Sequence, residues 1–149
     1  MKKYEFTGET KTVPLLFENV TLHRIQAITS FENVVAGELG GWIEKEENLS
    51  QGGNAWVGGN AQVSGNARVG GDARVFSINH ILTIGVIGSR DDFTTFYRDK
   101  DNEITVKCGC FSGKIDKFLE KVAQTHGDSK YAQVYKKAVE LAKLQILTG

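Results

Sequence analysis

Apolar and polar positions in the middle of the chain repeat with a period of six residues. Four consecutive hexads follow one another without a slip, at 54–59, 60–65, 66–71 and 72–77. In each hexad a valine follows an alanine by two positions, and a Gly-Asn or Gly-Asp pair joins one hexad to the next. Glycine and asparagine suit such corners because both tolerate positive φ. A six-residue period is typical of few architectures.

This pattern is similar to that of the hexapeptide-repeat superfamily. The resemblance implies a left-handed parallel β-helix in which the valine and the alanine of each hexad point inward. Steps of six backward from Ala55 reach Leu49 and Ile43, so we expect the helix to run from about residue 39 to residue 76. That length gives only about two coils, whereas solenoids usually need three or more repeats. End caps and packing into a homotrimer are expected to make up the difference.

The segments on either side of the repeat predict a β cap and an α+β lobe. Before the repeat, 3–8 and 21–28 are strand-like. After it the period is lost, and the apolar spacing becomes that of strands and then of helices. The predicted strands and helices of this last part are 78–84, 93–98, 103–108, 114–125 and 129–147.

The predicted fold class is therefore β-rich α+β, with a short left-handed parallel β-helix capped at both ends. Its three parts are an N-terminal β cap at 1–38, the hexapeptide repeats at 39–77, and a C-terminal β-β-β-α-α lobe at 78–149. Trp56 and Arg74 stand eighteen residues apart. We expect them on one outer face of adjacent coils, in a cation–π contact.

Composition narrows the classes of partner. Of 149 residues 40% are hydrophobic, and 18 basic residues balance 18 acidic ones, so no overall field attracts nucleic acid or a membrane. No apolar run reaches the length of a membrane span, and the first residues do not form an apolar signal segment. We expect a cytoplasmic protein. The cysteines, Cys108 and Cys110, flank one glycine and are expected to be reduced thiols.

The best candidate for ligand binding is the loop at 84–90. Glycines let backbone N–H groups approach an anion, Ser89 can donate a hydrogen bond, and Arg90 can bind phosphate or carboxylate bidentately. An ordinary tight turn with an exposed arginine is the alternative. Aromatic side chains nearby could stack on a base. The predicted ligand-binding residues are Gly88, Ser89, Arg90, Thr95, Tyr97, His126 and Tyr131.

Other chemistries find less support in the sequence. A zinc site would need a second pair of ligands, which the sequence lacks. No motif requires Cys108 or Cys110 to act as a nucleophile with His126. Ser89 does not lie in the nucleophile-elbow sequence that a triad with His126 and Asp128 would need. We therefore predict no catalytic residue, no metal and no cofactor.

Nearly the whole chain resembles small phage and prophage hexapeptide-repeat proteins. The residues that carry this resemblance are 40–44, 47–50, the hexads, 84–90, 108–111 and 125–128. It implies an accessory protein of an infected or lysogenic bacterial host that sequesters a phosphate-bearing small molecule, such as a cyclic nucleotide immune signal, without turnover. One alternative is a protein–protein inhibitor or structural trimerisation module with Trp42 and Trp56 as exposed anchors. Another is an enzyme, either an acyltransferase of the hexapeptide type or a nucleotide hydrolase, although the repeat contains no histidine.

Overall fold

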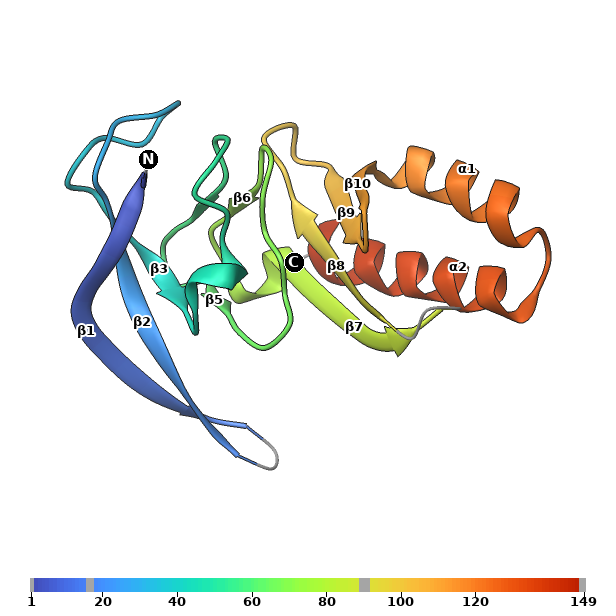
Figure 1. Cartoon of the computed structure of the whole chain (residues 1–149), viewed down its shortest axis with the longest axis horizontal. Helices are drawn as coiled ribbons and strands as arrows, with labels where there is room; N and C mark the ends of the chain where they lie inside the picture. The colour runs from blue at the N-terminus through green and yellow to red at the C-terminus, as the bar shows by residue number, and fades with distance from the viewer. Residues whose placement is uncertain (1, 16–17, 89–91, 148–149) are drawn as a thin grey trace. The chain divides into compact units, whose positions relative to one another are not determined.

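A computed structural model describes residues 2–15, 18–88 and 92–147. The chain divides into two compact units, Met1–Ile78 and Asn79–Gly149, and each is described by itself. The strands and helices follow one another as Figure 1 labels them. They are β1 (Tyr4–Pro14), β2 (Asn19–Ala27), β3 (Leu39–Ile43), a 3-10 turn (Glu46–Asn48), β4 (Trp56–Val57), β5 (Gln62–Val63), β6 (Arg74–Val75), a second 3-10 turn (Ile78–His80), β7 (Ile81–Ile87), β8 (Asp92–Arg98), β9 (Ile104–Cys108), β10 (Phe111–Lys114), α1 (Ile115–His126), α2 (Lys130–Ala142) and a π-helical segment (Lys143–Leu147).

The N-terminal unit is built on a long antiparallel pair. Strands β1 and β2 run alongside each other from Tyr4 opposite Ala27 to Pro14 opposite Asn19, with an irregularity between Phe6 and Thr10. Figure 1 shows this pair as a long curved ribbon. Strand β3 then pairs antiparallel with β2, and β5 closes a sheet in the order β1-β2-β3-β5.

The prediction of a left-handed parallel β-helix is wrong. Both four-stranded sheets that the described residues form are mainly antiparallel, and the hexads form no solenoid. They contribute only strands of two residues, in the parallel pairs β3–β5 and β4–β6 and in a bridge between Leu49 and Val69. The physical reason is length: turns take up most of each hexad, and the repeat is too short to stack the layers that a solenoid needs.

The apolar positions of the hexads nevertheless form the interior of this unit. Their valines and alanines are each at most 3% exposed. The backbone of β3 approaches them so closely that side chains do not fit there. A Cβ atom on Gly40 would lie 2.7 Å from both Ile25 and Trp56, and one on Gly41 would lie 2.8 Å from the carbonyl oxygen of Ala61. Small residues at these positions therefore allow the sheet to pack on the repeat.

Both tryptophans are buried, which corrects two expectations. Trp56 is fully buried and meets Phe31 edge-on, with ring centroids 5.5 Å apart. Arg74 lies opposite Trp56 in the β4–β6 pair, but its guanidinium donates a hydrogen bond of 2.6 Å to the carbonyl of Asn54. Trp42 is 8% exposed, beneath the ammonium of Lys11 at 4.3 Å from its ring. Neither tryptophan is therefore an exposed anchor.

Lys3 ties the start of β1 to the repeat. Its ammonium donates hydrogen bonds to the carbonyl oxygens of Gly52, Gly53 and Ala55, the last at 2.6 Å. Lys3 is 5% exposed. Burial and, to a smaller extent, the charge of Arg74 lower the pKa of Lys3 to about 8. A charged side chain is thus held in the interior by neutral acceptors.

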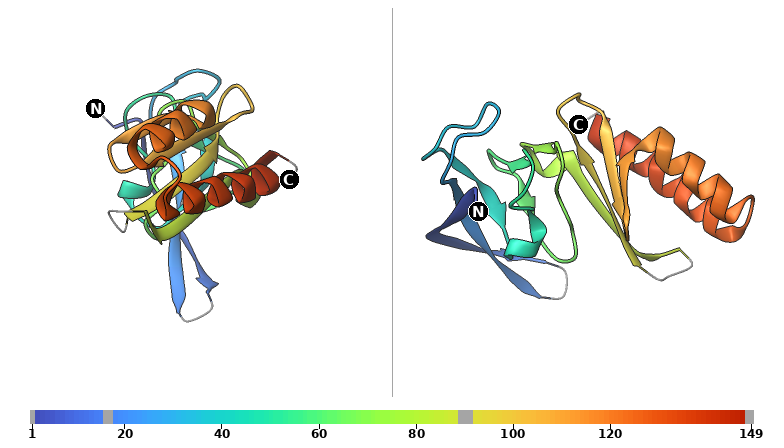
Figure 2. Two further views of the ribbon diagram at one scale, coloured as in Figure 1. Left: turned by 90° about the vertical axis from the view of Figure 1, so that its right-hand side faces the viewer. Right: turned by 45° about the horizontal axis from the view of Figure 1, so that its top comes forward.

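The described part of the C-terminal unit contains one antiparallel sheet, two α-helices and the π-helical segment that follows α2. The sheet has the order β10-β9-β8-β7. Helices α1 and α2 lie side by side along one of its faces, as the views in Figures 1 and 2 agree. Both helices bury an apolar stripe on that face. The core between sheet and helices includes Phe96, Val106, Phe118, Val122, Tyr135 and Val139. The sequence predicted three strands here, and the structure adds a fourth, β10.

Candidate functional site

A pocket of about 260 Å³ opens between the β9–β10 turn and the helices of the C-terminal unit. We call it the Cys108 pocket. It combines an apolar wall with thiol, hydroxyl, imidazole and charged groups, the mixture expected of a small-molecule site. Its lining consists of Asp92, Cys108, Gly109, Cys110, Phe111, Phe118, Lys121, Val122, Thr125, His126 and Tyr135.

A tight turn brings both thiols to this pocket. Cys108 ends β9 and lies opposite Phe111, the first residue of β10, so only Gly109 and Cys110 form the loop. Gly109 has a φ of 57°, which suits the first position of a two-residue hairpin turn. Cys108 is half-buried and Cys110 is exposed, and neither is in a disulfide.

Two hydroxyl groups converge on the sulfur of Cys108. The hydroxyl of Thr94, on the neighbouring strand β8, donates a hydrogen bond of 3.2 Å to it. The hydroxyl of Tyr135, on α2, lies 3.9 Å from the same sulfur. Burial, followed by the proximity of Cys108 and Asp92, raises the pKa of Tyr135 to about 12. The phenol therefore keeps its proton at neutral pH and can donate it to the sulfur.

Aromatic rings form the wall of the pocket. Phe118 packs edge-on against Tyr135, with centroids 5.4 Å apart, and Phe111 packs against Phe118 at 5.5 Å. His126, at the end of α1, stacks on Tyr135 at 6.0 Å and also meets Tyr131 at 5.5 Å. These contacts between the two helices hold the imidazole at the pocket.

The pocket carries charges of both signs. The Lys121 ammonium comes from α1, and the Asp92 carboxylate comes from the start of β8. Both side chains are exposed. Thr125, one turn after Lys121 on the same helix, adds a hydroxyl. The arrangement can bind a small molecule that has an apolar part and a polar or ionic end.

Three of the predicted ligand-binding residues lie at or next to this pocket. His126 lines it, and Tyr131 contacts His126. Gly88 follows β7 and packs so closely on Tyr135 that a Cβ atom at this position would collide with the phenol hydroxyl. Its φ of 86° also favours glycine.

Two further predicted residues are not brought to the pocket. Thr95 and Tyr97 are each 1% exposed. They alternate along β8 with Thr94 and Phe96, so their side chains leave the opposite face of the sheet from the one that the helices cover. Ser89 and Arg90 lie outside the described residues.

Sequence reasoning missed most of the pocket. Tyr135 and Lys121 were not among the predicted residues, and Cys108 was considered as a zinc ligand or as a nucleophile paired with His126 but was not predicted to bind the ligand. A signal was available in the Cys-Gly-Cys-Phe stretch at 108–111, because a glycine between strand-like residues marks a tight hairpin. The helix residues carried no comparable signal, since a tyrosine and a lysine on an amphipathic helix are usually a core and a surface residue.

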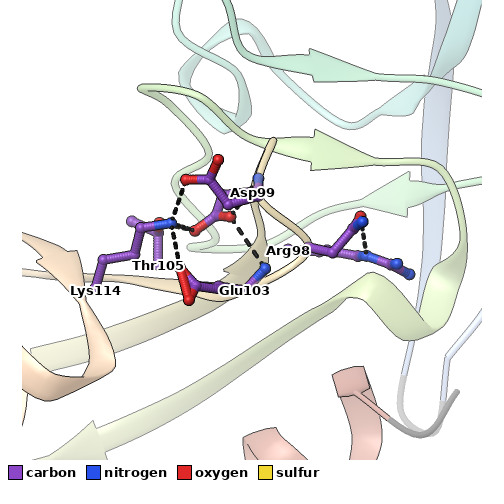
Figure 3. A network of polar contacts seen from close by, with 7 residues as sticks. Arg98, Asp99, Glu103, Thr105 and Lys114 are labelled. Atoms are coloured by element: carbon purple, nitrogen blue, oxygen red, sulfur yellow. Dashed lines mark hydrogen bonds and ion pairs between the residues drawn. The ribbon is translucent and has the colours of Figure 1, made fainter.

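A second polar cluster closes the β8–β9 turn of this unit. Asp99 is 2% exposed and accepts hydrogen bonds from the backbone N–H groups of Asp101 and Glu103, from the Thr105 hydroxyl and from the Lys114 ammonium. Lys114 also pairs with the carboxylates of Asp101 and Glu103, at 2.9 and 3.1 Å. Figure 3 shows Lys114 pointing into this group of carboxylates. The donors and acceptors match one another, so the cluster stabilises the turn.

The described part of the chain contains no group of three or more His, Cys, Asp or Glu side chains arranged to hold a metal ion. Among the same residues, no helix has the length and apolar character needed to cross a bilayer.

Part of the chain is similar to a known protein. No protein-family model matches the chain. The chain is 39% identical over 61 residues to the protein named "Uncharacterized acetyltransferase YdcK" of Escherichia coli (strain K12). The similarity covers 38% of this chain and 19% of that protein, so the chain spans only about a fifth of the relative it matches. This supports a relation to the hexapeptide-repeat superfamily at most.

Proposed function

We propose that the protein binds a small phosphate-bearing molecule in the Cys108 pocket and retains it without turnover. The observation that carries this proposal is the pocket itself, in which a wall of aromatic and aliphatic side chains adjoins a lysine, a histidine and a hydroxyl. A nucleobase would pack on Phe111, Phe118 and Val122. A phosphate group would be placed toward Lys121 and Thr125.

The finer identity of the ligand comes from the sequence resemblance. Small phage and prophage proteins resemble this chain, so the proposed ligand is a cyclic nucleotide that signals infection in a bacterial host. Sequestration would lower the free concentration of the signal. In this proposal the protein acts as a homotrimer.

Replacing Lys121 tests the placement of the phosphate. Calorimetric titration with cyclic dinucleotides, cyclic trinucleotides and mononucleotides identifies the ligand class, and chromatography of the released ligand checks that it is unchanged. Lys121→Gln is expected to weaken binding about tenfold or more, because a hydrogen bond to a charged group contributes roughly 1.5–3 kcal/mol. Asp92→Asn is expected to strengthen it, because a carboxylate that repels phosphate is removed.

Lys117→Gln is the matched control. Lys117 lies one turn before Lys121 on α1, is exposed and pairs with Glu120, and does not line the pocket. It removes the same charge from the same helix and is expected to leave affinity unchanged. Equal affinities of Lys121→Gln and Lys117→Gln would contradict the proposed placement, and the lack of any nucleotide that binds would contradict the ligand class.

A second candidate function is acyl transfer, which the partial similarity to a protein named as an acetyltransferase favours. Release of free coenzyme A from acetyl-coenzyme A in the presence of amine acceptors would support it. Sequestration and transfer are distinguished by whether the bound molecule is recovered intact.

A further inference from the structure

The Cys108 pocket holds a thiol that phosphate binding does not use. Cys108 lines the cavity together with the aromatic wall, and its side chain is only half-buried. The second thiol, Cys110, lines the same cavity from the exposed side of the loop. One pocket therefore presents a half-buried thiol and an exposed one.

The half-buried thiol is held in place by its neighbours. The Thr94 hydroxyl at 3.2 Å and the Tyr135 hydroxyl at 3.9 Å approach the Cys108 sulfur from β8 and α2. Thr94 is fully buried and Tyr135 is 8% exposed, so neither side chain is free to turn away. The sulfur is thus oriented by two fixed hydroxyl groups, whereas Cys110 stands on the exposed side of the turn.

The charges of the pocket indicate what kind of molecule would lie against this sulfur. Lys121 provides a cation and Asp92 an anion, both on the lining of the cavity. A molecule with one carboxylate and one ammonium complements this pair better than a simple anion or cation does. The phenyl rings of Phe111 and Phe118 provide surface for its carbon chain.

We infer that Cys108 is a site of reversible thiol–disulfide exchange with small disulfides of the amino-acid type, each half of which carries an ammonium and a carboxylate. The inference uses the pocket of the proposed function but does not depend on a phosphate ligand. Cys108 acts as the attacking group, and Thr94 and Tyr135 position it.

The exchange balances without any further reactant. The thiolate of Cys108 attacks one sulfur of the small disulfide, so a bond forms between the two sulfurs while the original disulfide bond breaks. The electron pair of that bond leaves with the second half of the molecule. This leaving thiolate takes up the proton that Cys108 lost. The Cys108 sulfur is oxidised and the leaving sulfur is reduced.

Intact-mass spectrometry of the full chain with cystine as the probe tests the inference. In the Cys110→Ser variant, Cys108 is expected to gain one half-cystine at a rate that saturates with cystine concentration, because binding precedes reaction. In the Cys108→Ser variant, Cys110 is expected to react roughly tenfold more slowly and without saturation, because no bound complex holds the disulfide beside it. If exposure alone set the rates, Cys110 would react faster than Cys108.

Two variants test the positioning role. Tyr135→Phe keeps the ring and removes the hydroxyl, and Thr94→Val removes the other hydroxyl at similar volume. Each is expected to lower the maximal rate at Cys108 several-fold while the half-saturating concentration changes little, because the binding surface is kept. Ser112→Ala is the control, since it removes a hydroxyl from an exposed residue of β10 that does not line the pocket.

The result that would overturn the inference is a Cys108 rate that is linear in cystine concentration or no faster than that of Cys110. Equal rates for the wild-type chain, Tyr135→Phe and Thr94→Val would overturn the positioning role. Circular dichroism of each variant confirms that it is folded.

Cystamine and dithiodiglycolate, which carry one sign of charge, are expected to react more slowly than cystine, and equal rates would contradict the amino-acid class. Failure of the exchange leaves the phosphate titration unaffected, so the two proposals fail separately.

Discussion

Lys3 in the N-terminal unit and Lys114 in the C-terminal unit perform similar tasks in opposite electrostatic surroundings. Each links segments of its unit through several hydrogen bonds. The partners of Lys3 are backbone carbonyl groups, whereas those of Lys114 are the carboxylates of Asp99, Asp101 and Glu103. Burial lowers the pKa of Lys3 to about 8. Burial also acts to lower the pKa of Lys114, but hydrogen bonds and charges of the carboxylates outweigh it and raise that pKa.

The difference separates two quantities that are often treated as one. A neutral hydrogen-bond acceptor satisfies an N–H group of an ammonium, but it compensates for the loss of hydration less well than a carboxylate does. Lys3 makes three hydrogen bonds, yet its surroundings still disfavour the charged form of the side chain. Lys114 is 41% exposed, and its surroundings favour the charged form. Three changes test this comparison.

The largest effect is expected from Asp99→Ala. The substitution removes the buried acceptor of four hydrogen bonds, including the shortest ion pair of Lys114, at 2.7 Å. The free energy of unfolding of the C-terminal unit is expected to fall by about 3 kcal/mol, since buried donors lose their partner. Denaturant unfolding followed by circular dichroism measures it. Asp101→Ala, which removes an exposed carboxylate, should cost far less, and similar losses for both variants would contradict the assignment.

The pH dependence of the N-terminal unit is expected to reveal Lys3. Its pKa is about 8 when folded and 10.5 ordinarily. Between these values the unfolded chain binds more protons, so the free energy of unfolding rises with pH across this window. The gain is expected to be roughly 2–3 kcal/mol and to be missing in Lys3→Met. Denaturant midpoints from pH 8 to 10.5 measure it, and Lys2→Met, whose lysine side chain is 61% exposed, serves as control. If stability depends on pH in the same way in the wild-type chain and in Lys3→Met, the lowered pKa of Lys3 is contradicted.

The smallest effect is expected from Lys117→Gln. Its ion pair with Glu120 spans 3.4 Å between side chains that are 76% and 60% exposed. Solvent screening leaves such a pair at most about 0.5 kcal/mol. A loss of unfolding free energy as large as that of Asp99→Ala would show that the exposure of a lysine does not decide how much its ion pair stabilises the protein. The same denaturation experiment provides the value.

Much of the local structure was predictable, but its assembly was not. The hexad valines and alanines are buried as their spacing predicts, and α1 and α2 lie close to the predicted helices. The pairing of the hexads was not predictable, because two-residue strands leave little pattern from which to infer their partners. The burial of Trp56 depends on Phe31, which is far from it in the sequence. Strand β10 was missed because Phe111 is its one large apolar residue.

The candidate site was predicted only in part, for a similar reason. His126 and Gly88 stood out because a histidine between helices and a glycine in a turn are local signals. Tyr135 meets the Cys108 sulfur only after α2 has folded onto the sheet. Position 135 looks like any core residue of an amphipathic helix until that packing is known. A site assembled from three distant segments is therefore hard to find from periodicity alone.

The placement of the two tryptophans gives each unit its own optical signal. The chain has two tryptophans, Trp42 and Trp56, and both belong to the N-terminal unit, whereas α1 and α2 belong to the C-terminal unit. Indole fluorescence excited at the red edge of absorption thus reports on one unit, and helical ellipticity reports mainly on the other. Unfolding curves recorded by both signals in one sample will coincide if the units melt together and separate if they melt independently.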